Sequence, residues 1–338
     1  MPYRFSALCL WFAPAQPWRN NMQSVLNPGG PNETIIQHLF WFFFAFCLAA
    51  FVLLIVYMSI GMARHQRQAV PAPVFANPEG DQKGRRGVIG AVVASTLALF
   101  LLLAATVRSS KANSSPPAGP DPVTIQLIGH QWWWQVNYLS RQPGHDFTTA
   151  NEIHLPVGVP IHMLLTSVDV IHSFWVPSLR GKRDLLPGYQ TDIWFRVKKP
   201  LVYRGQCAQF CGAEHAEMGF LVVAESAAKY HRWLLAQRRP AAAPATALQR
   251  EGQQVFLTHA CILCHTIRGT QAGSNEGPDL THLASRKTIG GAILVNDIGN
   301  LGGWIENPQS IKPGVLMPPN PLPPQQLTAL LAYLEHLR

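Results

Sequence analysis

Charged side chains are scarce in this chain: 13% of its 338 residues are Asp, Glu, Lys or Arg, against 48% hydrophobic residues. This balance indicates one or two membrane segments beside soluble parts. The net charge is +9, yet the basic residues form no long run and no basic amphipathic helix. This pattern speaks against nucleic acid as a partner and favours positive charge placed by membrane topology.

Cysteine is also sparse, with six residues in the whole chain. Cys9 and Cys47 lie in apolar segments and behave as small hydrophobic residues. The other four form two pairs, Cys207 with Cys211 and Cys261 with Cys264. Histidines and methionines near both pairs indicate metal sites, and two disulfides in an exported domain are the structural alternative.

Two long stretches contain no charge at all, residues 39–62 and 88–107. At about 1.5 Å per residue, each can cross a hydrocarbon layer of roughly 30 Å, so we predict a transmembrane hairpin. Positive residues prevail in the loop between them and place that loop in the cytoplasm. Both termini then face outward, and everything after Val107 is extracytoplasmic. These basic residues are Arg64, Arg67, Lys83, Arg85 and Arg86.

The chain start resembles a signal peptide. Residues 1–22 contain one arginine among the first residues, a short apolar run and the sequence Ala13-Pro14-Ala15, an A-x-A cleavage pattern. Alternatively, Met22 is the true start. In either case, residues 23–120 comprise an N-terminal segment and the transmembrane hairpin.

The remaining chain divides at a Pro-rich and Ala-rich linker, residues 237–247. Before it, residues 121–236 show short alternating runs such as VTIQLI and TDIWFRV, which predict antiparallel strands of a sandwich or barrel. In the second run, Ile193, Phe195 and Val197 share one face. Residues 248–338 end in an amphipathic helix and otherwise show little core of their own, which is typical of a small domain held together by a cofactor.

The segment Cys261–His265 reads C-x-x-C-H, the attachment signature of c-type haem. Two thiols at this spacing add to the two vinyl groups of the porphyrin, and the next histidine then lies under the iron. Cys261 and Cys264 are therefore predicted attachment points, and His265 the proximal ligand. Zinc or a redox dithiol is the alternative, but this domain has no further cysteine and no thioredoxin-like strand–helix pattern.

The distal haem ligand is predicted by elimination. Met317, in VLMPP, is the sole methionine after Met218, and His/Met ligation gives the higher potential that suits an electron carrier. The competing ligands are His259, His282 and His336, which we expect on the surface.

A second cluster of soft ligands lies in CAQFCGAEHAEM, which holds Cys207, Cys211, His215 and Met218. An upstream strand end, DVIHSFWVP, offers His172. Thiolates and a thioether favour copper, and two bridging thiolates can hold two copper ions, each with one histidine and one weak ligand. Zinc bound by the two cysteines and one histidine, or a disulfide, stays open as an alternative.

Three blocks, GHQWWWQVNY, DVIHSFWVPSLRGKRDLLPG and GQCAQFCGAEHAEM, follow the apolar hairpin in this order. They resemble the hallmark blocks of cytochrome c oxidase subunit II. The tail, with CILCHTIRG, GPDLTHLASR and IKPGVLMPP, resembles the cytochrome c domain fused to subunit II in many bacterial oxidases. The resemblance implies a multidomain membrane protein with a two-helix transmembrane hairpin, an all-β cupredoxin (Greek-key) domain and an all-α cytochrome c domain.

The resemblance also implies a dinuclear copper centre, CuA, beside the haem c. Its ligands would be His172, Cys207, the main-chain oxygen of Gln209, Cys211, His215 and Met218. Trp132 matches a tryptophan at which family members accept electrons from soluble cytochrome c, and aromatic packing is its alternative role. The family usually has glutamate where Gln209 stands, and that carboxylate helps to hold magnesium at the subunit I interface. Gln209 lacks the charge, so magnesium binding is expected to be weakened or lost.

The resulting functional prediction is an electron-input subunit of an aerobic terminal oxidase in the bacterial inner membrane, with both soluble domains outside. The resemblance implies subunits I and III, membrane lipid and a c-type cytochrome or other donor as partners. Oxygen reduction and proton pumping would lie in a partner chain, with no catalytic residue here. A CuA subunit of a nitric oxide reductase and a membrane-tethered electron carrier are the alternatives.

Overall fold

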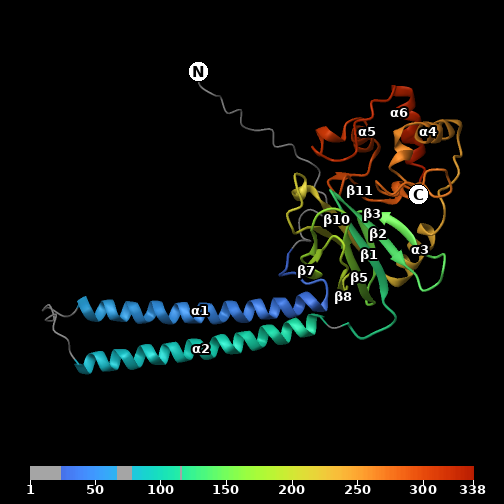
Figure 1. Cartoon of the computed structure of the whole chain (residues 1–338). Coiled ribbons are helices and arrows are strands. Elements are labelled where there is room, and N and C mark those ends of the chain that lie inside the picture. The colour runs from blue at the N-terminus through green and yellow to red at the C-terminus, as the bar shows by residue number, and fades with distance from the viewer. Residues whose placement is uncertain (1–23, 67–77, 115) are drawn as a thin grey trace, which may run out of the picture. The chain divides into compact units, whose positions relative to one another are not determined.

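The computed structural model describes residues 24–66, 78–114 and 116–338 (Figure 1). The predicted signal peptide, with Cys9 and Met22, lies outside these residues, as does Arg67 of the predicted cytoplasmic loop. The chain divides into two compact units, one formed by residues 34–115 and the other by residues up to 33 together with 116–338.

Two long helices, α1 (Pro31–Gln66) and α2 (Pro78–Ser114), make up almost all of the first unit. Both contain a span that is long and apolar enough to cross a membrane, Pro31–Arg64 and Gln82–Lys111. The helices extend beyond the predicted ranges 39–62 and 88–107, because a helix can continue into polar residues once the apolar span is complete. Within α2, the hydroxyls of Ser95, Thr96 and Thr106 donate to carbonyls four residues earlier, which satisfies them without water.

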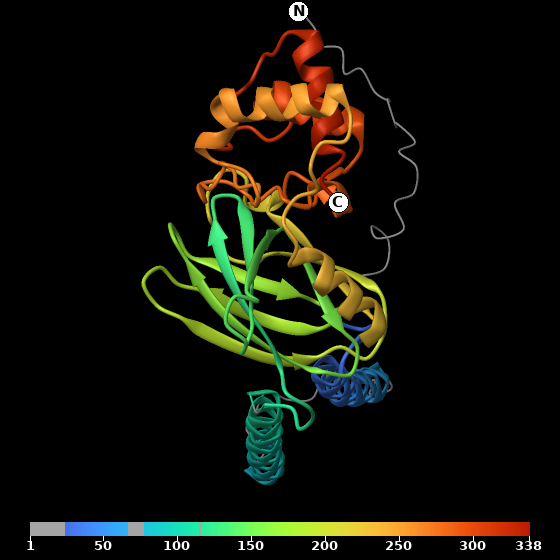
Figure 2. The same ribbon diagram turned by 90° about the vertical axis from the view of Figure 1, so that its right-hand side faces the viewer.

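The β domain (residues 121–236) consists of two five-stranded sheets that face each other (Figure 2). The first has the order β3-β2-β1-β5-β8, and the second β4-β10-β9-β6-β7. The first sheet comprises β1 (Val123–His130), β2 (Trp133–Leu139), β3 (Phe147–Ala150), β5 (Pro160–Ser167) and β8 (Thr191–Arg196). The second comprises β4 (Glu152–Pro156), β6 (His172–Val176), β7 (Arg180–Leu185), β9 (Val202–Cys207) and β10 (Gly219–Glu225).

The core of the β domain lies between the two sheets. Strands such as β1 and β2 alternate buried with partly buried side chains, whereas β4 and β10 are buried almost throughout. The prediction that Ile193, Phe195 and Val197 share one buried face is confirmed, as each is at most 4% exposed. The predicted antiparallel pairing holds for most strand pairs, but β1 pairs in parallel with β5, and β4 with β10. Both parallel pairs join strands that are distant in sequence, which local alternation cannot reveal.

Helix α3 (Ala227–Gln237) ends the β domain, and α4 (Ala247–Thr258) begins the C-terminal domain (residues 248–338). That domain also contains α5 (Ile298–Glu306), α6 (Pro324–Leu334) and a short ladder of β11 (Thr288–Ile289) with β12 (Leu294–Val295). The expectation of little core is wrong. Side chains from α4, α5 and α6 form a buried apolar cluster that includes Phe256, Leu301, Leu330 and Tyr333. The residues of this core come from three helices that are separated by segments of unequal length. A search for one periodic run in the sequence therefore could not reveal the core.

A buried histidine couples the stability of the β domain to pH. His154 lies on the Trp233 ring with centroids 4.1 Å apart, and its Nε2 is 2.9 Å from the Glu152 carboxylate. Its Nδ1 lies 3.6 Å from Glu225. Burial by itself would lower the pKa of His154, but the two carboxylates outweigh burial and raise that pKa above its ordinary value of 6.5.

We therefore expect pH-dependent stability that His154→Gln removes. A raised folded-state pKa means that the stabilisation is fully present below about pH 6.5 and is lost as the pH rises through the folded-state value. The free energy of unfolding should fall by on the order of 1 kcal/mol over this window in the parent and stay flat in the variant. Thermal unfolding followed by circular dichroism at several pH values measures this. His162→Gln is the matched control, because His162 also stacks on a tryptophan and meets a carboxylate, but nearer the surface. Equal pH slopes in the parent and in His154→Gln would contradict the assignment.

Candidate metal and haem sites

The first site is built where strands of the second sheet end. His172 is the first residue of β6, Cys207 is the last of β9, and Met218 directly precedes β10. The loop from residue 208 to 217 contains the 3₁₀ turn η1 (His215–Glu217). Because β9 and β10 are antiparallel neighbours, the Cys207 amide donates to the Met218 carbonyl at 3.0 Å. This bond closes the loop of residues 208–217, which we call the copper loop after its predicted ligand.

The sulfur of Cys207 is the centre of the first half of the site. It lies 3.9 Å from Nδ1 of His172, 3.2 Å from the carbonyl oxygen of Gln209 and 3.8 Å from the sulfur of Cys211. The second half centres on Cys211, whose sulfur lies 3.5 Å from Nδ1 of His215 and 3.8 Å from the sulfur of Met218. The structure therefore brings together all six donor groups predicted from sequence, in two sets that share the cysteines.

The donor set is sheltered from water. His172 and Met218 are 0% exposed, and Cys207 and Cys211 are 4% and 3% exposed. The two thiols share a hydrogen bond, which lowers the pKa of Cys207 well below its usual range and raises that of Cys211. A dithiol with one acidic member is suited to metal binding, because the thiolate is the form that binds a metal ion.

Residues outside the donor set fix its orientation. Asp169 accepts from Nε2 of His172 at 2.8 Å, which leaves Nδ1 free to face the sulfurs. Asp169 also accepts from the Gln131 amide, and the Gln131 side chain donates to the Cys211 carbonyl at 2.6 Å. The sequence prediction missed both residues. The position of Asp169 three residues before His172 is the signal that could have revealed it.

Close packing at Gly129 also fixes the orientation of the His172 ring. A Cβ atom at Gly129 would lie 2.6 Å from Cδ2 of His172, so any side chain there would displace the ring. The chemistry of the set fits copper, because two thiolates and a thioether are soft ligands and two imidazole nitrogens are intermediate ones, with one carbonyl oxygen as the single hard donor. The donor atoms of His172, Cys207 and Cys211 all lie within 4.8 Å of one another.

The second site begins at the turn η2 (Ala260–Leu263), which carries Cys261 and leads to Cys264 and His265. The His265 amide donates to the Cys261 carbonyl at 3.0 Å, which brings both cysteines and the histidine into one turn. Nδ1 of His265 donates to the Pro278 carbonyl at 2.8 Å, so Nε2 remains available to an iron atom. Burial lowers the pKa of His265 and keeps the ring neutral, as a ligand requires.

The fit of a haem at His265 is also visible in its surroundings. A Cβ atom at Gly277 would lie 2.8 Å from Cε1 of His265, so glycine is needed beside the imidazole. Cys261 and Met317 both pack against the core of the C-terminal domain. Gln309, which sequence reasoning missed, organises the methionine loop: its amide nitrogen donates to the carbonyls of Val315 at 2.6 Å and Met317 at 3.0 Å.

The expectation that the competing histidines lie on the surface is wrong for His282. It is 3% exposed, and its Nε2 lies 3.0 Å from the Arg239 carbonyl. The contact joins the C-terminal domain to the beginning of the linker that precedes it. His259 and His336 are half-buried and lie near backbone carbonyls, at 2.9 and 3.0 Å.

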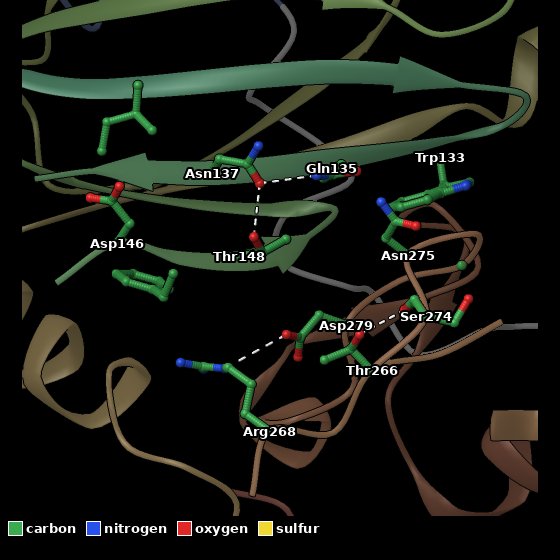
Figure 3. Close-up of a pocket in the computed structure, with 13 residues that line it drawn as sticks. Trp133, Gln135, Asn137, Asp146, Thr148, Thr266, Arg268, Ser274, Asn275 and Asp279 are labelled. Atoms are coloured by element: carbon green, nitrogen blue, oxygen red, sulfur yellow. Dashed lines mark hydrogen bonds and ion pairs between the residues drawn. The ribbon is translucent and has the colours of Figure 1, made fainter. Parts of the chain in front are cut away.

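A cavity of about 460 Å³ separates the edge of the first sheet from the segment that follows His265 (Figure 3). Asn137 accepts from Thr148 at 2.9 Å on one side, and Arg268 lies 3.7 Å from Asp279 on the other. These polar groups pair largely with each other, so the cavity is not assigned a ligand.

Known protein families match both the β domain and the C-terminal domain. A family described as "Cytochrome C oxidase subunit II, periplasmic domain" matches residues 141–226, and the family "Cytochrome c" matches residues 249–338. Cytochrome c oxidase subunit 2 of Alkalihalophilus pseudofirmus is 32% identical over 93% of this chain and 91% of its own length. The chain belongs to the cytochrome c oxidase subunit 2 family. The predicted family, the β cupredoxin-like domain and the helical cytochrome c domain are thereby confirmed.

Two further similarities cover less of the chain. Cytochrome c oxidase subunit 2 of Bacillus subtilis is 27% identical over 64% of this chain and 63% of its own length. The crystal structure of the periplasmic domain of subunit II of cytochrome oxidase from Bradyrhizobium japonicum is 27% identical. It covers 37% of this chain and 97% of that chain, with a TM-score of 0.33. All six predicted copper donors fall within the first family match, and the four predicted haem residues fall within the second. Trp132 lies outside both.

Proposed function

We propose that the chain is the electron-input subunit of an aerobic haem–copper terminal oxidase and passes electrons from a c-type cytochrome donor through haem c and CuA to subunit I. Membership of the subunit 2 family supports the coarser statement that it is an electron-input component of a terminal oxidase with subunit I as partner. The observation that carries the finer proposal is the convergence of donor atoms from His172, Cys207, Gln209, Cys211, His215 and Met218 around the two buried cysteine sulfurs.

In this proposal, Cys207 and Cys211 would hold the copper of a CuA centre together with His172, His215, Met218 and the Gln209 carbonyl. Such a centre would supply one-electron transfer. The chain's own part is to hold the donors in fixed positions and to exclude water, which the burial of His172 and Met218 supports.

In the cytochrome c domain, Cys261 and Cys264 would attach the porphyrin, and His265 and Met317 would bind its iron. Haem c supplies a one-electron carrier whose potential rises with a thioether ligand. The Pro278 hydrogen bond orients His265, and Gln309 orders the loop of Met317.

Magnesium has weaker support than copper. Gln209 is exposed and offers an amide where a carboxylate would suit the hard cation. We therefore propose weak magnesium binding or none. Proton translocation and oxygen chemistry are assigned to partner subunits, because residues 39–62 and 88–107 carry no charge.

The two apolar helices and the periplasmic-domain match make this a membrane protein with an extracytoplasmic domain. We propose the bacterial inner membrane as its site and subunit III as an additional partner. A nitric oxide reductase subunit and a membrane-tethered carrier are the competing assignments. Purification of the intact complex separates them: the oxidase proposal predicts a co-purifying haem-bearing subunit I and oxygen uptake. Nitric oxide consumption without oxygen uptake, or the absence of a catalytic partner, would contradict it.

A further inference from the structure

Several hydrogen bonds join the cytochrome c domain to the β domain, and three of them involve residues 287–292. The Lys287 amide donates to the Glu152 carboxylate at 2.9 Å, Arg204 donates to the Ala292 carbonyl at 2.8 Å, and the Gly219 amide donates to the Gly291 carbonyl at 3.0 Å. Backbone amides donate two of these bonds, so hydrogen exchange at these amides reports directly whether the two domains are docked.

A lysine lies buried in the same interface. Lys312 is 2% exposed, and its ammonium donates to the carbonyls of Trp132 at 2.9 Å, Glu217 at 2.9 Å and Gly290 at 3.1 Å. The first two carbonyls belong to the β domain and the third to the cytochrome c domain. Three donors meet three acceptors, so the cost of burying the ammonium is offset only while both domains stay in place.

Trp132 connects this lysine to the copper loop. Its indole Nε1 donates to the Cys211 carbonyl at 3.0 Å, while its own carbonyl accepts from Lys312. A Cβ atom at Gly212 would lie 2.9 Å from the indole ring, and one at Gly314 would lie 3.8 Å from it. Gly314 is in the loop that leads from Lys312 to Met317, so the indole contacts both ligand-bearing loops.

We propose that Lys312 is a positioning residue that holds the Met317 loop against Trp132 and so fixes the separation between the haem site and the copper site. This inference rests on the proposed function, since the separation matters only if both sites carry electrons. Electron tunnelling slows steeply with distance, and a docked interface keeps the path short. In this arrangement Trp132 serves the chain's own cytochrome c domain.

The test compares Lys312→Met with the parent in the intact, metallated and haem-loaded complex. Methionine keeps most of the side-chain volume but removes all three donors, which leaves three buried carbonyls without a partner. Lys287→Met is the matched control. Lys287 is the other lysine of residues 248–338, and its side chain is exposed while its backbone amide makes the interface bond.

Two measurements are made on each variant. Hydrogen exchange of peptides that contain Gly219 and Lys287 should be about tenfold faster or more in Lys312→Met, because the interface opens more often. After photoreduction of the haem, electron transfer to copper should slow by a similar factor when the rates are compared at equal driving force, taken from the reduction potentials measured for each variant, while the copper EPR signal stays unchanged. Slower transfer at equal driving force identifies a positioning role.

Exchange and transfer rates equal to those of the parent would overturn the proposal, as would the same slowing in Lys287→Met. If Lys312→Met lacks haem or copper, Lys312→Gln replaces it, because glutamine retains two donors. In Lys312→Gln, faster hydrogen exchange and slower electron transfer, each by a smaller factor than for the loss of all three donors, support the proposal. Rates equal to those of the parent overturn it. If the parent itself lacks the copper or haem signal, the proposed function fails, and the exchange comparison alone decides whether Lys312 holds the interface.

Discussion

Replacing Cys207 by serine should abolish the two-copper EPR signal and reduce electron delivery to subunit I by at least about 100-fold, the upper end of what outer-shell changes cause. The Cys207 sulfur lies within 3.9 Å of His172, Gln209 and Cys211. A hydroxyl cannot bridge two copper ions as a thiolate does, since it is harder and far less acidic.

The covalent haem should remain in Cys207→Ser, because its attachment residues belong to a separate domain with its own core. Copper content, EPR and the optical haem spectrum are measured on one sample. Cys47→Ser is the matched control, since Cys47 is a free, exposed cysteine of α1 far along the chain from both sites. A Cys207→Ser protein that keeps two coppers and their shared signal would contradict the ligand assignment.

Replacing Met317 by leucine should have the second largest effect. Leucine nearly matches the volume of methionine but offers no sulfur, so the iron loses its distal ligand while the fold persists. We expect the haem potential to fall by on the order of 100 mV, a fraction of the roughly 0.8 V range that axial ligands control. Electron input should slow, and the copper signal should stay intact. Redox titration of the haem band measures this.

Met163→Leu is the control for the exchange itself, because Met163 is 0% exposed in β5 of the other domain. Its haem potential should match that of the parent. An unchanged potential in Met317→Leu would instead point to one of the histidines His259, His282 and His336 as the distal ligand.

The elements that sequence reasoning captured have strong local patterns. Uncharged runs predicted the two helices, alternation predicted the face shared by Ile193, Phe195 and Val197, and the spacing of Cys261, Cys264 and His265 predicted the haem turn. Each pattern lies within a short window, where periodicity and ligand spacing directly reflect geometry.

The elements that it missed depend on residues far apart in sequence. The parallel pairing of β1 with β5 follows from the course of the chain between sheets, and Lys312 meets Trp132 across 180 positions. Lysine is ordinarily a surface residue, so its type gives no hint of burial. Asp169 and Gln309 act through other residues, and their roles become visible only when the loops are seen in contact.

We propose that one extracytoplasmic unit carries a haem c and a thiolate-bridged pair of coppers. The decisive experiment is an EPR spectrum of the oxidised, purified complex, with copper and iron counted on the same sample. We expect hyperfine splitting from two equivalent copper nuclei, together with a covalently bound haem in this chain. A zinc-loaded, EPR-silent cysteine site, or a Cys207–Cys211 disulfide without copper, would contradict it.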